Sequence, residues 1–199
     1  MKWPVPRRAQ LGTGALVVAA LSVGQVLVEH LPSVDRAGRP FEREIAIDQT
    51  VKLRTGSLTV TGVDGAREIR PEQGDPFVSP GLAIVVRFDF TPSVPETTIT
   101  FGELRDADER VTSVSVFGAR SVITCPRPPV GITTHCTAVV EADPDTLPGA
   151  RLALGPSAID PRFDDVAVTD LDITERDVKE WQDRKTPLDV PAPAVAGMS

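Results

Sequence analysis

Short runs of alternating apolar and polar residues fill the chain from residue 41 to residue 173, and they constrain its fold more than any other feature. A period of two places the apolar side chains on one face of an extended strand. Before residue 173, no stretch shows the spacing of a helix. The successive runs are EREIAID, TVKLR, SLTVTGV, LAIVVRFDF, TTITFGEL, VTSVSVFGA, RSVIT, TAVVEA, ARLAL and VAVTDLDI.

Residues that favour turns separate these runs. They are Thr55-Gly56, Val63-Asp64-Gly65, Ser79-Pro80-Gly81, Asp106 to Glu109 and Asp143-Pro144-Asp145. Roughly nine or ten short strands with turns at this density are typical of an antiparallel sandwich. The sequence therefore predicts an all-β domain over residues 41–174.

The N-terminal region carries the signature of export. Lys2, Arg7 and Arg8 precede residues 11–28, which contain no charged side chain. A spanning helix needs about 20 apolar residues and a cleaved signal needs about 7 to 15, so a run of this length allows both interpretations. We favour an uncleaved transmembrane signal anchor because the apolar run continues to Val28. Two alternatives remain: cleavage before Val23, with Ala20 and Ser22 as the small residues, which would give a secreted chain, and a twin-arginine signal.

This interpretation divides the chain by compartment. Basic residues before the anchor keep residues 1–10 in the cytoplasm, residues 11–28 span the cell membrane once, and residues 29–40 form a linker. Everything after the anchor is then extracytoplasmic, in the cell envelope.

The exported part is acidic. It holds 18 basic and 28 acidic residues, a formal charge of −10. Nucleic acid and anionic lipid headgroups bind clustered positive charge, so neither is an expected partner. No cofactor is predicted, and the oligomeric state stays open.

The two cysteines, Cys125 and Cys136, are expected to form a disulfide. An even number of cysteines at short spacing indicates a disulfide in an oxidising compartment. Zinc is the rival, because His135 adjoins Cys136. However, the chain's other histidine, His30, abuts the membrane, so Cys and His cannot complete a four-ligand site, and no metal is predicted. Closing this loop should stabilise the fold by about 3 kcal/mol.

A helix is predicted near the C-terminus. Thr174 is placed as an N-cap with Asp177 three residues later, a variant of the capping box, while Ile173 and Val178 form a hydrophobic staple. A short helix over residues 175–184 follows, and Trp181 is expected to dock on the sandwich. Residues 185–199 are proline-rich, have no apolar pattern, and are predicted to form a disordered tail.

No catalytic residues are predicted. A serine hydrolase needs a positioned histidine, and His135 lacks a recognisable nucleophile. The acidic clusters do not match an EF-hand loop. The alternative, a secreted hydrolase or calcium-dependent enzyme, would gain support if Asp106, Asp143 and Asp145 converged on one pocket.

Several segments resemble an exported immunoglobulin-like domain family of unknown function from Gram-positive bacteria, similar in fold to a small secreted mycobacterial antigen. They are GRPFEREIAIDQTVKLRTGSLTVTGVDGAREI, GLAIVVRFDF, FGELRDADERV, VVEADPDTLPGARLAL and DPRFDDVAVTDLDI. The resemblance covers about residues 38–174 and implies an immunoglobulin-like sandwich without defined functional residues. The cysteine pair and the C-terminal helix lie outside its general pattern.

These observations favour a module that binds a protein or another ligand in the cell envelope. A partner within the same membrane is as consistent with the short linker as a soluble ligand. Sheets commonly recruit peptides by adding a strand at an edge, and TVKLR or SLTVTGV would serve if either lies at an edge.

Overall fold

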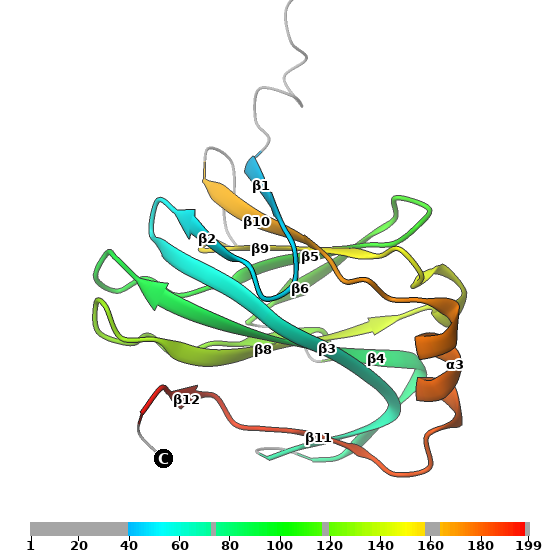
Figure 1. Ribbon diagram of the computed structural model, residues 1–199. Coiled ribbons are helices and arrows are strands. Elements are labelled where there is room, and N and C mark those ends of the chain that lie inside the picture. Colours follow the sequence, from blue (N-terminus) through cyan, green and yellow to red (C-terminus); the bar gives the residue numbers. More distant parts are fainter. Residues whose placement is uncertain (1–39, 73–74, 117–119, 158–163, 198–199) are drawn as a thin grey trace, which may run out of the picture. The chain divides into compact units, whose positions relative to one another are not determined.

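The computed structural model describes residues 40–72, 75–116, 120–157 and 164–197 (Figure 1). The predicted cytoplasmic segment 1–10, anchor 11–28 and linker up to residue 39 lie outside the described residues. In the part of the chain that is described, no helix has both the length and the apolar character needed to cross a membrane.

The described residues are mostly strand, in agreement with the predicted all-β fold. In chain order the elements are β1 (Phe41–Ile45), β2 (Thr50–Leu53), β3 (Gly56–Pro71), β4 (Phe77–Pro92), β5 (Phe101–Arg105), β6 (Val111–Ser115), β7 (Val122–Thr124), β8 (Thr134–Ala142), the 3-10 helix η1 (Pro144–Thr146), β9 (Arg151–Gly155), β10 (Asp165–Asp170), α3 (Glu175–Asp183), β11 (Leu188–Val190) and β12 (Ala194–Val195).

The strands form two layers, joined at one narrow junction. The first layer has the order β1-β10-β9-β5-β6, and the second has the order β7-β8-β4-β3. Most neighbours are antiparallel, but β1 and β10 are parallel, and so are β6 and β7. Strands β2 and β11 pair with β3, and β12 pairs with β8. Figure 1 shows the first layer above the second, as in a sandwich that approaches a barrel.

The main core lies between the two layers because each strand turns its apolar face inward. Alternate residues of β4 and β8 point into it and are fully buried, and β9 contributes from the opposite layer. Its largest side chains include Leu58, Leu82, Ile84, Phe88, Phe90, Leu104, Leu152 and Leu154.

Two of the predicted turns were wrong. Val63-Asp64-Gly65 and Ser79-Pro80-Gly81 lie inside β3 and β4, which are 16 residues long each. The segment Ser79-Pro80-Gly81 still marks an irregularity in β4. Opposite it, the β3–β4 register shifts between Ala66 and Glu68. Proline and glycine here bend a long hairpin instead of ending its strands. Figure 1 shows β3 curling so that its last residues run beneath β8.

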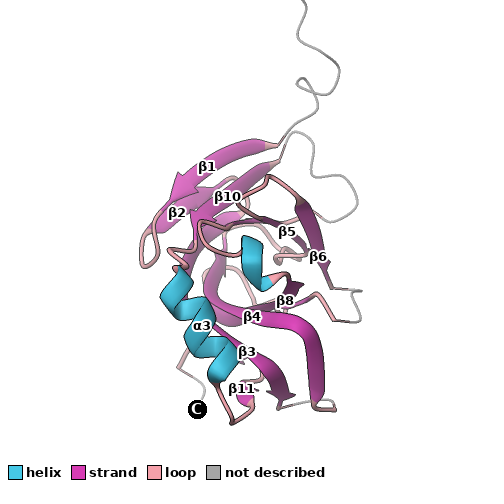
Figure 2. Ribbon diagram, turned by 90° about the vertical axis from the view of Figure 1, so that its right-hand side faces the viewer, coloured by secondary structure: helices cyan, strands magenta, loops and turns pink. Residues whose placement is uncertain are grey.

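Helix α3 closes one end of the core (Figure 2). The predicted capping box is present: the Asp177 N–H donates to Thr174 Oγ1, and the Thr174 N–H donates to the Asp177 carboxylate at 3.0 Å. Trp181 is buried against Gly65, where an added Cβ would come within 2.5 Å of the indole ring. The glycine thus allows the ring to approach the β3 backbone.

The segment predicted as a disordered tail is extended but paired. β11 runs parallel to β3 from Ile69 to Pro71, and β12 pairs with β8 at Thr134 and His135. Val190 completes a small second core on the outer face of β3, β4 and β8. The prediction failed because backbone pairing, rather than an apolar pattern, holds these residues in place.

Candidate functional site

The two layers meet along two boundaries, and the first of them is bridged. Here β2 lies near β1 and β10 without a strand ladder. The Arg54 N–H donates to the Asp165 carboxylate at 3.1 Å, and the Arg54 guanidinium contacts Asp164 at 2.8 Å. Arg43 on β1 pairs with Asp165 at 3.4 Å. We call this boundary the seam.

The second boundary lies between β6 and β8 and is only partly bridged. β7 is three residues long and pairs with β6 at one position, Ser115 opposite Val122. Among the described residues, the second edge of β6 therefore has no strand partner from Val111 to Val114.

Two hydrogen bonds fix which backbone groups of β6 face this open edge. The Ser115 N–H donates to Ser121 O at 3.5 Å, away from β5, whereas the Asp106 N–H donates to Arg110 O at 3.1 Å within the β5–β6 hairpin. Because backbone direction alternates along an antiparallel pair, the N–H and C=O groups of Val111 and Ser113 point outward like those of Ser115.

A cleft of about 540 Å³ lies beside this edge, and we call it the edge cleft. Its floor includes Leu104, which is almost fully buried, together with Pro80, Gly81 and Ala142. The remaining lining residues are Ser79, Asp106, Arg110, Thr112, Glu141, Asp143, Pro144 and Thr146. An apolar floor beside unpaired strand groups is suited to a ligand with its own backbone hydrogen-bonding groups.

Asp106 organises the β5–β6 turn at one side of the cleft. Its carboxylate accepts hydrogen bonds from the N–H groups of Asp108 and Arg110 and from Arg110 Nε, each at 2.9 Å. Desolvation raises the pKa of Asp106, but these donors together favour the charged form more strongly, so its pKa is lowered. The carboxylate is therefore ionised at neutral pH.

Glu141 and Ser79 lie on the other side. The Glu141 carboxylate pairs with Arg120 at 3.5 Å, and the Glu141 backbone N–H donates to Ser121 Oγ at 3.3 Å. The Ser79 hydroxyl is buried without a hydrogen-bond partner among the described residues.

The acidic clusters converge in part. Asp106 and Asp143 both line the edge cleft, while Asp145 does not. Asp143 accepts a hydrogen bond from the Asp145 N–H at 3.1 Å and caps η1, so its carboxylate also has a local structural role. In the described ranges, no group of three or more His, Cys, Asp and Glu side chains is arranged to hold a metal ion.

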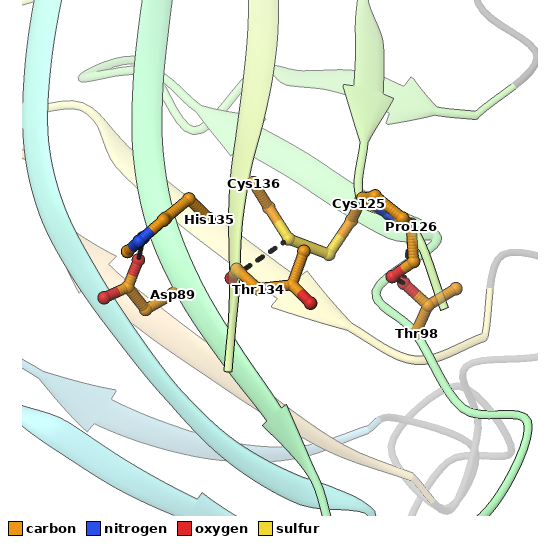
Figure 3. Close-up of a disulfide and its surroundings, with 7 residues drawn as sticks. All are labelled: Asp89, Thr98, Cys125, Pro126, Thr134, His135 and Cys136. Atoms are coloured by element: carbon orange, nitrogen blue, oxygen red, sulfur yellow. Dashed lines mark hydrogen bonds and ion pairs between the residues drawn. A yellow bond between two sulfur atoms is a disulfide. The ribbon is translucent and has the colours of Figure 1, made fainter. Parts of the chain in front are cut away.

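The predicted disulfide between Cys125 and Cys136 is present (Figure 3). It joins the end of β7 to β8, next to the junction at which the layers separate. Thr98 Oγ1 lies 2.7 Å from Cys125 O and 3.1 Å from Pro126 O, which ties the disulfide loop to the β4–β5 connection. The disulfide is thus placed to hold β7 against β8.

His135 lies on the outer face of β8, opposite Asp89 of β4, and its Nδ1 is 2.6 Å from the Asp89 carboxylate (Figure 3). The side chain is half-exposed and does not line the edge cleft. The structure therefore does not bring His135 together with the acidic residues of the cleft.

Sequence reasoning missed the edge strand. SLTVTGV lies in β3, where residues 57–59 pair with both β2 and β4 and residues 60–63 pair with β4. TVKLR includes β2, which lies at the bridged seam. The open edge belongs to β6, within the run VTSVSVFGA. In the structure Val111, Thr112 and Ser113 are exposed, as expected at an edge, but alternation in the sequence does not distinguish an edge strand from an internal one.

Comparisons with known proteins give fold similarities alone. A search of protein-family models found no match, and a search of curated proteins found none either. Among solved structures, the chain is similar to the yjhA protein from Bacillus subtilis, with a TM-score of 0.45 and 12% identity over 63% of this chain and 99% of that one. It is also similar to an uncharacterized β-sandwich protein from Clostridium difficile 630, with a TM-score of 0.42 and 10% identity over 65% of this chain and 95% of that one.

Proposed function

We propose that this protein is a membrane-anchored, extracytoplasmic binding module that takes up an extended polypeptide segment as an added strand on β6. The observation that carries the proposal is the edge cleft beside Thr112 of β6. On either side of Thr112, Val111 and Ser113 direct backbone groups away from β5. A peptide beside β6 would pair with these groups, and main-chain hydrogen bonds supply affinity in strand addition.

The side chains around the cleft define the chemistry of the segment. Its apolar floor, with Leu104 and Ala142, favours a small or β-branched side chain on the inward face of the peptide. Three acidic residues, Asp106, Glu141 and Asp143, line the cleft against two guanidinium groups, that of Arg110 in the lining and that of Arg120, which pairs with Glu141. This balance favours a lysine or arginine in the ligand.

The cellular setting of the proposal rests on the sequence. The uncharged run 11–28 after a basic segment supports a single-pass anchor, with the sandwich held in the cell envelope and a membrane or envelope protein as partner. Secretion after cleavage is the alternative. Membership of the exported immunoglobulin-like family is likewise proposed, and the disulfide within one layer differs from the inter-sheet disulfide of antibody domains.

One observation favours a second candidate, a calcium-dependent or hydrolytic activity. Asp106 and Asp143, from separate acidic clusters, meet in the edge cleft. Against it, both carboxylates already accept local hydrogen bonds. Calorimetric titration with Ca²⁺ separates the candidates: specific binding that Asp143→Asn removes would favour the second, whereas the peptide-binding proposal predicts no such heat.

The test of peptide binding uses the full chain in lipid vesicles and a library of short, β-branched peptides that carry one lysine or arginine. We predict that Ser113→Pro weakens binding of the selected peptides about tenfold or more, because proline removes an outward N–H without removing a β5–β6 bond. Loss of one hydrogen bond alone accounts for about 0.5–1.5 kcal/mol, and the proline ring also blocks close approach.

The matched control is Lys52→Pro on β2. The Arg54 N–H points away from β3, toward Asp165. Because backbone direction alternates along a strand, the Lys52 N–H also points away from β3 and toward the seam. This variant should bind the selected peptides as the unchanged protein does. Equal binding by Ser113→Pro would contradict strand addition at β6.

A further inference from the structure

Exposed apolar side chains gather at one end of the sandwich. Six large apolar residues are exposed in the described ranges, and four of them, Phe41, Val94, Val130 and Ile132, have exposed fractions of 59%, 42%, 48% and 40%. They come from the start of β1, the β4–β5 connection and the disulfide loop. We call the end that they share the entry end, because residue 40 leads into β1 there.

A chain of contacts links these segments. The Phe41 N–H donates to Asp164 O at 2.8 Å, and Asp164 is ion-paired with Arg54. Next to Arg54, Thr55 O accepts a hydrogen bond from the Ser93 N–H at 2.9 Å. Finally, the Gly131 N–H donates to Pro92 O at 2.9 Å. Phe41 takes part in these hydrogen bonds itself, and Val94, Val130 and Ile132 each lie next in sequence to a residue that does.

The loops that carry these residues are held in place. The disulfide closes residues 125–136, and Thr98 Oγ1 joins this loop to the β4–β5 connection. Thr91 and Thr133 share a hydrogen bond of 2.8 Å at the base of both loops. Loops held in this way expose apolar side chains at little further cost in conformational entropy on binding.

The entry end is nearly free of net charge, although the exported part as a whole carries −10. The two loops, residues 92–97 and 126–133, contain a single acid, Glu96, and a single base, Arg127. The nearby Asp164 and Asp165 are paired with Arg54 and Arg43. A surface without excess negative charge is not repelled by an anionic leaflet.

The chain that leaves this end is short. Residues 29–39 separate the proposed anchor from Pro40. A linker of this length has a typical end-to-end distance of about 20 Å and reaches about 40 Å when fully extended. The anchor would therefore keep the entry end close to the bilayer surface.

We infer that the entry end rests on the lipid bilayer, with Val94, Val130 and Ile132 inserted at the level of the headgroups. This inference rests on the proposed anchor at residues 11–28. Apolar side chains presented by turns at a membrane surface gain by leaving water, and the pairing of the neighbouring charges limits the cost of approach. Contact would fix the orientation of the sandwich, so the edge cleft would keep one direction relative to the membrane.

The experiment uses the full chain reconstituted into phosphatidylcholine–phosphatidylglycerol vesicles that hold no other protein. A single environment-sensitive fluorophore is attached at Val94→Cys, Val130→Cys or Ile132→Cys, while the native cysteines remain paired. The matched control is Val78→Cys, since Val78 is 65% exposed but lies at the opposite end of β4. We expect emission at shorter wavelength and quenching by nitroxide lipid at the three entry-end positions, and neither at Val78.

A carbonate wash of the same vesicles separates the two proposals. Suppose that the chain stays with the vesicles but aqueous iodide quenches the entry-end fluorophores as strongly as the fluorophore at position 78. The inference of membrane contact is then wrong, while the proposed anchor is supported. If carbonate releases the chain, the anchor is wrong and the inference falls with it. A Val130→Asp, Ile132→Asp variant should remove the quenching at Val94→Cys without releasing the chain.

Discussion

The two boundaries between the layers of this sandwich differ in how their strand edges are covered. At the seam, side chains from β1, β2 and β10 bridge strands that do not share a ladder. At the edge cleft, β7 provides one pairing position and then diverges, which leaves the outward groups of β6 without a strand partner among the described residues. The difference teaches that polar side chains can protect a strand edge, while a short intervening strand leaves one available for binding.

The largest predicted effect removes a buried side chain from the main core, which lies between the two layers. Trp181→Ala should destabilise the protein by about 3–5 kcal/mol, because it empties a core position between α3 and β3. Denaturant unfolding measures the loss. Gly65→Ala provides the control: its added methyl group should be costly beside Trp181 and much less costly in the Trp181→Ala background, where the remaining close contact is Ile84 Cδ1 at 3.1 Å. Equal costs in both backgrounds would contradict the packing described.

The second prediction concerns the edge cleft alone. Replacing both Cys125 and Cys136 by alanine should cost about 3 kcal/mol, since the open chain gains conformational freedom when unfolded. Because the disulfide holds β7 beside β8, amide exchange should rise more in β7 and β6 than at the seam, where the increase should not exceed that expected from the lower global stability. An equal or larger increase at the seam would show that the two boundaries are not independent.

A smaller effect is expected at the seam. Arg54→Ala removes an exposed ion pair with Asp164 but keeps the backbone donor to Asp165, so we predict a loss of at most about 1 kcal/mol. Arg70→Ala is the control, because the Arg70–Asp189 pair is more exposed and 3.5 Å long, and its loss should be close to zero. A stability loss well above that of Arg70→Ala, with β2 amides exchanging faster, would mark the bridge as essential to closure.

The smallest effect is a pH dependence in α3, away from both boundaries. The side-chain hydrogen bond with Thr174 lowers the pKa of Asp177. A depressed folded-state pKa gives stability that is present above about pH 4 and is lost as the pH falls through the lowered pKa. Asp177→Asn should therefore flatten a plot of unfolding free energy against pH on its acid side, as measured by denaturant unfolding. An unchanged plot would contradict a stabilising role for the Asp177 carboxylate.

Local patterns predicted the local structure well. The period-two runs gave most strands, Thr174 and Asp177 gave the helix start, and the cysteine count gave the disulfide. The neighbours of each strand were not predictable, because alternation reports which face is buried and not which edge is paired. The free edge of β6 and the paired tail both depend on contacts between residues distant in sequence.

Amide hydrogen exchange of β6 tests the central claim most directly. In the full chain without peptide, the Val111 and Ser113 amides should exchange quickly, while those of Thr112 and Val114, directed at β5, should be protected. A peptide selected from the library should protect Val111 and Ser113 and leave β2 unchanged. Protection of both amides before the peptide is added, or tight peptide binding that leaves them in fast exchange, would contradict strand addition in the edge cleft.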